Sequence, residues 1–135
     1  MTSPAAAEQT LIESYSIIPD PHERMSAIVA ACAGPGLGEG ERREEDLVPG
    51  CVSRVWLTGA SEKGALKLRW DADSPLVKGL TGLVCGVYHG ASPAEAAAHR
   101  TNIIAGLKFD RQLSPTRLNG LENVGRRIQE IAAGL

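Results

Sequence analysis

The residues of this 135-residue chain best suited to chemistry are three cysteines, Cys32, Cys51 and Cys85. No two of them have the spacing of a zinc-binding pair, and an odd number of widely separated cysteines does not form a disulfide framework. We therefore expect three free thiols, no metal site, and a reducing, cytoplasmic location. Only the thiolate form of a cysteine is nucleophilic, so the surroundings of each one decide what it can do.

Two of the cysteines lie in apolar patterns typical of helices. Cys32 completes an i, i+3, i+4, i+7 series that begins at Met25, and Cys85 lies within the apolar run 83–87. Free cysteine behaves as a small hydrophobic residue in such places, and burial raises the pKa of its thiol. We predict that both side chains pack in the core and are poor nucleophiles.

Cys51 lies in a different setting, a turn that precedes a predicted strand. It follows Pro49 and Gly50, a pair typical of turns, and Gly50 can adopt backbone angles that present the next side chain outward. Ser53 and Arg54 follow, and a nearby arginine favours the thiolate. These local features leave two interpretations open, a half-buried turn cysteine or a reactive loop thiol supported by Gly50, Ser53 and Arg54.

The chemistry of such a thiol is more easily sulfur exchange than hydrolysis. A hydrolytic cysteine needs a positioned histidine base, and His22, His89 and His99 are all remote from Cys51 in sequence. A thiolate that exchanges sulfur attacks another sulfur atom directly and needs no dedicated base.

Helix signals flank a central pair of predicted strands. Asp20 and Pro21 begin a helix that ends before Gly34. Alternating patterns predict strands at 52–58 and 65–70, joined by a turn at 59–64, and Leu47 and Val48 could add a third strand. Further helices are predicted at 75–88, from Pro93 to about His99, and from Pro115 onward. This order predicts an α+β fold, with a small antiparallel sheet of about three strands flanked by helices.

Length and charge narrow the classes of function. A chain of 135 residues is expected to form one domain over 1–135, with residues 1–9 as a flexible N-terminus. The 14 basic residues against 16 acidic ones and the few aromatic residues argue against a nucleic-acid partner. No apolar run approaches the roughly 20 residues of a membrane-spanning helix. We therefore expect a protein partner and no membrane.

Three motifs resemble the SufE family of sulfur-acceptor proteins, in the order of that family. Residues 48–56 (Val-Pro-Gly-Cys-Val-Ser-Arg-Val-Trp) resemble its signature loop. Residues 71–74 followed by 77–80 resemble its acidic turn and helix start, and 113–117 with Gly120-Leu121 resemble its C-terminal motif. The resemblance extends over about residues 17–128.

The resemblance implies a fold like that of the IscU scaffold proteins and a specific role. SufE-like proteins are not enzymes themselves but sulfur-transfer partners and activators of an enzyme. They bind a pyridoxal-phosphate-dependent cysteine desulfurase of the SufS type, stimulate it, and accept sulfur from its persulfide. They pass this sulfur to an iron–sulfur scaffold complex of the SUF system. On this basis Cys51 is the persulfide acceptor, and the pyridoxal phosphate belongs to the partner.

The resemblance also implies partner contacts. Arg117 matches a family arginine that contributes to desulfurase docking, although it could simply be an exposed arginine at a helix start. Asp73 is a second candidate partner contact, with a helix cap as its alternative.

Three alternative functions remain open from the sequence. An iron–sulfur scaffold of the same fold needs several converging thiolates, whereas only Cys51 is predicted to be available. A CsdE-like protein, which serves a second desulfurase, shares the motifs of the SufE family. A non-catalytic adaptor would carry Cys51 incidentally.

Overall fold

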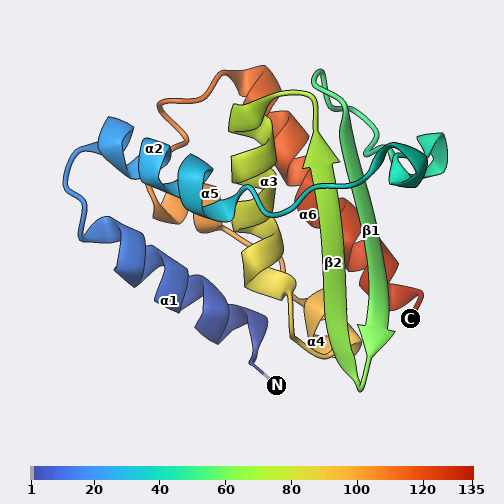
Figure 1. The fold of residues 1–135 in the computed structure, drawn as a ribbon. Helices are drawn as coiled ribbons and strands as arrows, with labels where there is room; N and C mark the ends of the chain where they lie inside the picture. The colour runs from blue at the N-terminus through green and yellow to red at the C-terminus, as the bar shows by residue number, and fades with distance from the viewer. Residues whose placement is uncertain (1) are drawn as a thin grey trace.

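The computed structural model describes residues 2–135 and forms an α+β fold, as predicted (Figure 1). An antiparallel hairpin lies against the long helices, and the segment after the second helix crosses the front of the hairpin (Figure 1). Within the described residues no helix is long and apolar enough to cross a membrane. The elements are α1 (Pro4–Ser16), α2 (Pro21–Cys32), the 3-10 turns η1 (Glu39–Glu41) and η2 (Glu44–Asp46), β1 (Val55–Glu62), β2 (Ala65–Ala72), α3 (Pro75–Tyr88), α4 (Pro93–Ala98), α5 (Ile103–Gly106) and α6 (Pro115–Ala133).

The sheet of the described chain has two strands, so the prediction of about three is wrong. Leu47 makes only an isolated bridge to Trp56, because Pro49 has no N–H to continue a strand and the chain then turns away. The predicted turn at 59–64 is also too long, since β1 stays paired with β2 up to Glu62. Lys63 and Gly64 form the turn with φ of 53° and 80°, the positive values that a tight hairpin turn requires.

Helix α3 is the centre of the core, and its bounds match the predicted helix at 75–88. Ser74 caps it by accepting a hydrogen bond from the Val77 N–H, and Pro75 occupies its first position. The helix packs against β2, α1, α2 and α6. Its largest fully buried side chains are Leu80, Leu83, Val84 and Tyr88. A helix surrounded in this way is apolar on nearly every face.

The N-terminal segment, where the sequence predicted a flexible end at residues 1–9, forms helix α1 from Pro4 onward. Ser3 caps α1 by accepting a hydrogen bond from the Ala6 N–H at 3.1 Å. Glu8 then fastens the helix to the segment after α4, because its Oε1 accepts hydrogen bonds from His99 Nε2 and from the Asn102 N–H. Alanine-rich sequence favours a helix, and this side-chain contact anchors it. Met1 lies outside the described residues.

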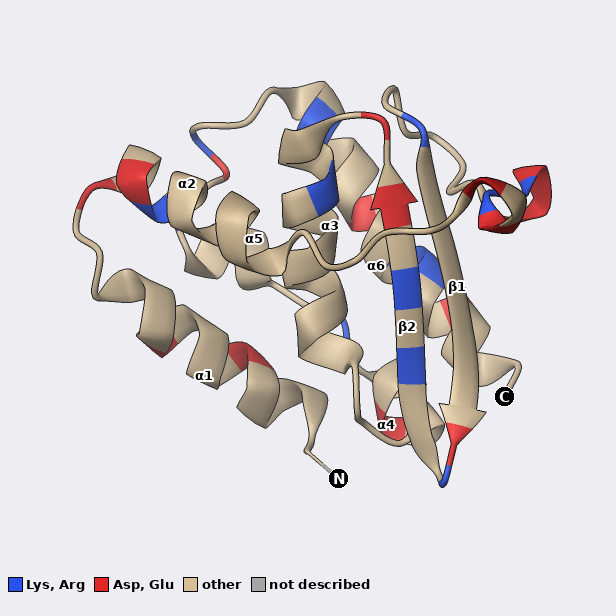
Figure 2. Cartoon of the chain, viewed as in Figure 1, with Lys and Arg blue, Asp and Glu red and all other residues tan. Residues whose placement is uncertain are grey.

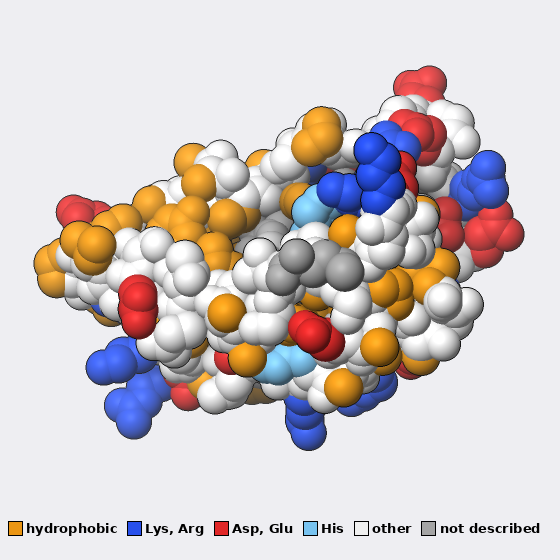
Figure 3. Space-filling view, turned by 90° about the horizontal axis from the view of Figure 1, so that it is seen from below, with side chains coloured by type: hydrophobic (Ala, Val, Ile, Leu, Met, Phe, Trp, Pro, Cys, Tyr) orange, Lys and Arg blue, Asp and Glu red, His pale blue; other side chains and the backbone are white. Residues whose placement is uncertain are grey.

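The surface has two contrasting regions. Charged residues are concentrated on η1 and η2, and they also recur along β2 (Figure 2). Seen from below, hydrophobic side chains are most frequent at the end where α1 and α2 meet, the junction that includes the exposed Ile17 (Figure 3). The loop that carries Cys51 lies at the end of the hairpin near the start of α6 (Figure 1).

Candidate functional site

Cys51 lies in the loop 48–55, whose two ends are tied together. The Val48 N–H donates to the Val55 carbonyl at 2.8 Å, and the Asp73 N–H donates to the Arg54 carbonyl at 3.0 Å. These two hydrogen bonds hold the ends of the loop, at Val48 and at Arg54–Val55, in place, and we call this part the neck of the loop. The loop extends from the neck toward α6. Gly50 has φ of 78°, a conformation that other residues adopt with strain, so the turn at this position depends on glycine.

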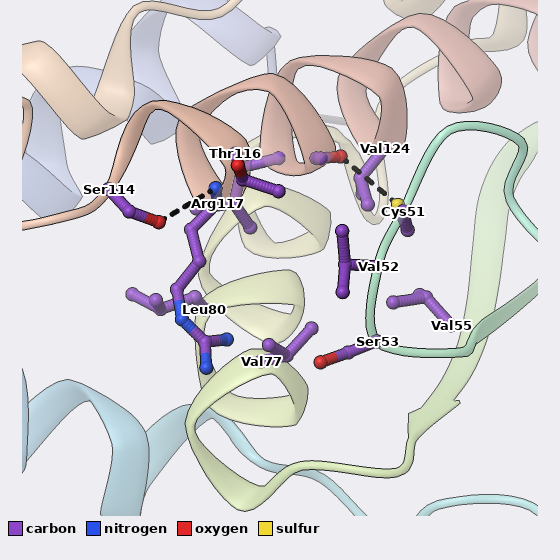
Figure 4. Close-up of a pocket in the computed structure, with 12 residues that line it drawn as sticks. Cys51, Val52, Ser53, Val55, Val77, Leu80, Ser114, Thr116, Arg117 and Val124 are labelled. Atoms are coloured by element: carbon purple, nitrogen blue, oxygen red, sulfur yellow. Dashed lines mark hydrogen bonds between the residues drawn. The ribbon is translucent and has the colours of Figure 1, made fainter.

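The thiol of Cys51 faces α6 (Figure 4). Its Sγ donates a hydrogen bond to the Gly120 carbonyl at 3.4 Å, and the residue is half-buried. A Cβ at Gly120 would lie 3.5 Å from this sulfur, an ordinary van der Waals contact, so the thiol packs directly against this part of α6. The expectation that Gly50 presents Cys51 outward is therefore wrong, because the turn directs the side chain toward the protein.

A cavity of about 200 Å³ lies under the loop, between α3 and α6. Its walls are mostly apolar, and Arg117 is the only charged residue among those that line it. The cavity-lining residues of α6 include four with i, i+3, i+4, i+7 spacing, which places them on one face of the helix. The lining residues are Cys51, Val52, Ser53, Val55, Val77, Leu80, Ser114, Thr116, Arg117, Gly120, Leu121 and Val124.

Burial raises the pKa of the Cys51 thiol above its ordinary value. We expected Arg54 to lower this pKa, and that expectation is wrong. The Arg54 guanidinium instead lies over the ring of Trp56, 5.2 Å from its centroid, and the Arg42 guanidinium lies 4.9 Å from the same centroid. This cation–π contact directs the charge of Arg54 to the indole ring. The resting thiol is therefore protonated and protected.

The raised pKa predicts slow alkylation of Cys51 in the folded protein. At pH 8 we expect iodoacetamide to modify it more slowly than in the urea-denatured chain, with the rate still rising above pH 9, because only the thiolate reacts. The raised pKa of Cys51 also stabilises the folded state at pH values below the ordinary thiol pKa. This stabilisation is lost as the pH rises through the pKa that the thiol has in the folded protein. Peptide mass mapping at each pH gives the rate for Cys51. A folded-state rate at or above the denatured rate at pH 8 would contradict the protected state.

The other two cysteines pack as predicted. Cys85 is fully buried in α3, and burial raises the pKa of its thiol strongly. Cys32 is half-buried against the core, its Sγ lies 3.6 Å from the hydroxyl oxygen of Tyr15, and burial also raises its pKa. Across residues 2–135, no three His, Cys, Asp or Glu side chains are grouped so that they could hold a metal ion. The scaffold alternative thus gains no ligand set from the described residues.

Arg117 lies in the first turn of α6, and its side chain extends into the cavity toward Val77 and Leu80 (Figure 4). Its backbone N–H donates to Ser114 Oγ at 3.2 Å, which caps the helix. The side chain is half-buried, and among the residues that the structure describes it forms no ion pair. The structure thus brings Arg117 to the same cavity as Cys51, although the two lie far apart in sequence.

Asp73 lies beside the neck of the loop and is exposed. It does not cap α3, because Ser74 does. Its backbone N–H donates to the Arg54 carbonyl and so supports the loop, and its side chain lies exposed at the edge of the site.

The sequence placed Asp71 in an acidic turn but did not reveal its role, which is to hold the segment before the loop. Its buried carboxylate accepts hydrogen bonds from the Leu37 N–H at 2.9 Å and from Arg42 at 2.8 Å. Burial alone would raise its pKa, but these bonds outweigh burial and lower it. They fasten the segment before the loop onto β2. An acidic residue at the end of a predicted strand was the one signal, and its partners are distant in sequence.

The fold and the site together define a small α+β protein that holds one thiol in a loop above a cavity. The family model described as "SufE: Fe-S metabolism associated domain" matches residues 9–132. An uncharacterized SufE-like protein of Rhizobium etli is 31% identical over 133 residues, which cover 94% of this chain and 90% of the relative. The chain therefore belongs to the SufE family, whose members are generally sulfur-transfer partners.

A solved structure shares the fold. The solution structure of a hypothetical protein from Thermus thermophilus has a TM-score of 0.79 at 23% sequence identity. The similarity covers 99% of this chain and 97% of that one. The chain therefore has the same fold as this solved structure over nearly its whole length.

Proposed function

We propose that this protein accepts sulfur on Cys51 from a pyridoxal-phosphate-dependent cysteine desulfurase of the SufS type and passes it to an iron–sulfur scaffold complex. One observation carries the proposal. Cys51 is the cysteine that lies in a loop at the mouth of a cavity, whereas Cys32 and Cys85 pack within the helices. Free thiols suit a reducing, cytoplasmic compartment.

The transfer is a thiol–persulfide exchange. Cys51 loses its proton, and its thiolate attacks the outer sulfur of the persulfide on the desulfurase cysteine. A new S–S bond forms to Cys51 Sγ, the S–S bond of the partner breaks, and the partner thiolate leaves with the electron pair. No net oxidation occurs, and this chain needs no cofactor of its own.

The exchange requires Cys51 to leave its resting position. A single S–H···O bond holds the thiol at Gly120, and thiols are weak donors. Val52, next along the loop, is 81% exposed and offers an apolar contact to a partner. We infer that docking moves the loop about its neck, and that Arg117 and Asp73 contact the desulfurase on either side of it. Departure from the cavity removes the burial that raises the pKa of Cys51 in its resting position.

The decisive experiment follows the sulfur atom. The protein is incubated with L-cysteine and a cysteine desulfurase of the SufS type, and its peptides are mapped by mass spectrometry. We expect one added sulfur atom on the peptide that carries Cys51, together with faster desulfurase turnover. The same experiment is repeated with the second desulfurase, the one that CsdE-like proteins serve. If sulfur uptake and faster turnover occur with that enzyme but not with a SufS-type enzyme, the result favours the CsdE-like assignment. No added sulfur with either enzyme would contradict the proposal.

A further inference from the structure

We propose that Arg117 binds the persulfide anion of Cys51 inside the cavity once sulfur has been accepted. This inference rests on the proposed function and assigns to Arg117 a role beyond docking. It is carried by the hydrogen bond of the resting thiol, by the charge in the cavity, and by the geometry of α6.

The resting position of Cys51 suits a protonated thiol and excludes an anion. The thiol holds its place by donating a hydrogen to the Gly120 carbonyl. A persulfide anion has no hydrogen to donate, and its charge is repelled by the partial negative charge of a carbonyl oxygen. The loaded side chain therefore has to turn away from Gly120.

The same cavity contains one group that attracts an anion. Arg117 is half-buried, and its guanidinium has no carboxylate partner within the described part of the chain. A guanidinium in the first turn of a helix is also disfavoured by the helix dipole, so its position brings no local stabilisation. Apolar walls such as Leu80 and Val124 strengthen its attraction for an anion by excluding water.

Arg117 and Gly120 lie close together on the face of α6 that lines the cavity. Arg117 is three residues before Gly120, which corresponds to less than one turn and a rise of about 4.5 Å. The added sulfur extends Cys51 by about 2 Å, the length of an S–S bond. In Figure 4 the Arg117 side chain extends toward Leu80 and Val77, and Val52 lies between it and Cys51 in this view. For the contact, the loaded Cys51 side chain turns away from Gly120, and the long Arg117 side chain turns from Leu80 and Val77 toward it, within the cavity that both residues line.

This arrangement protects the sulfur during transport. A terminal sulfur paired with Arg117 lies against apolar walls, where small thiols in solution reach it poorly. Release to the scaffold complex then requires the loop to move outward again. The resting thiol and the loaded persulfide thus occupy two positions in one cavity.

The test uses the isolated protein without a desulfurase. Cys51 is loaded with inorganic polysulfide, and the loss of the added sulfur to 2-mercaptoethanol is followed by peptide mass mapping. We expect Arg117→Gln to lose the sulfur about tenfold faster than the wild type, a factor that corresponds to about 1.4 kcal/mol. Arg117→Lys, which keeps the charge but not the planar fork, is expected to be intermediate.

A matched control separates this contact from general charge effects. Arg111 is exposed, does not line the cavity and lies shortly before α6, so Arg111→Gln is expected to keep the wild-type rate. An unchanged rate in Arg117→Gln, or an equal acceleration in Arg111→Gln, would overturn the inference. Because the sulfur is loaded chemically, this outcome is independent of whether a desulfurase delivers sulfur to Cys51.

Discussion

Replacement of Cys51 by serine is expected to abolish sulfur uptake and the stimulation of the desulfurase. Serine can keep the hydrogen bond to the Gly120 carbonyl, so the loop retains its resting position. A hydroxyl at neutral pH does not attack a persulfide, and removal of a nucleophile eliminates the covalent route. We expect sulfur uptake at least about 100-fold slower than in the wild type. Mass mapping after incubation with L-cysteine and desulfurase measures it, and alanine production reports the turnover.

The matched control is Cys32→Ser. Cys32 is also half-buried and free, but it contacts Tyr15 at the far end of α2. We expect this variant to accept sulfur and stimulate the desulfurase as the wild type does. Cys51→Ser should still bind the desulfurase and compete with the wild-type protein, since its surface is unchanged. Full stimulation by Cys51→Ser would show that Cys51 is not the acceptor.

The elements that the sequence predicted well are those fixed by neighbouring residues. Ser74 and Pro75 fix the start of α3 through capping and a preset φ, and the predicted bounds match. The hairpin was also predicted, although its turn was expected to begin too early. Gly59 is a usual turn residue, but here it pairs with Leu68 within the sheet. Pairing across the sheet outweighed the local preference.

The candidate site was predictable in its residue types but not in its geometry. The Pro-Gly turn and the resemblance singled out Cys51, but its contact with Gly120 spans 69 positions. The bond from Arg42 to Asp71 likewise joins residues far apart in sequence. The contact of Arg54 with Trp56 is local, but the sequence did not show that the guanidinium turns to the indole ring and away from Cys51. A thiol pKa is set by such surroundings, so the sequence suggested a lowered value where the fold produces a raised one.

The largest expected effect on stability comes from Gly82→Ala in α3. A Cβ at this position would lie 1.7 Å from the Cys32 carbonyl oxygen, at the point where α2 crosses α3. A backbone oxygen cannot turn aside as a side chain can, so the two helices have to separate. Alanine favours a helix interior by about 1 kcal/mol over glycine, but overpacking of this severity costs more. We expect the free energy of unfolding to fall by about 3 kcal/mol and Tm by roughly 10 °C.

Gly86→Ala, one turn further along the same helix, is expected to have the opposite sign. A Cβ there would meet Leu11 Cδ1 at 3.5 Å, an ordinary contact, so only the helix preference remains. We expect the free energy of unfolding to rise by about 0.5–1 kcal/mol. Urea unfolding followed by circular dichroism measures both variants. Equal effects of the two substitutions would show that α2 and α3 do not cross closely at Gly82.

Gly82→Ala is also expected to speed the alkylation of Cys51. The reason is that α2 leads directly into the segment before the loop, which Asp71 holds in place.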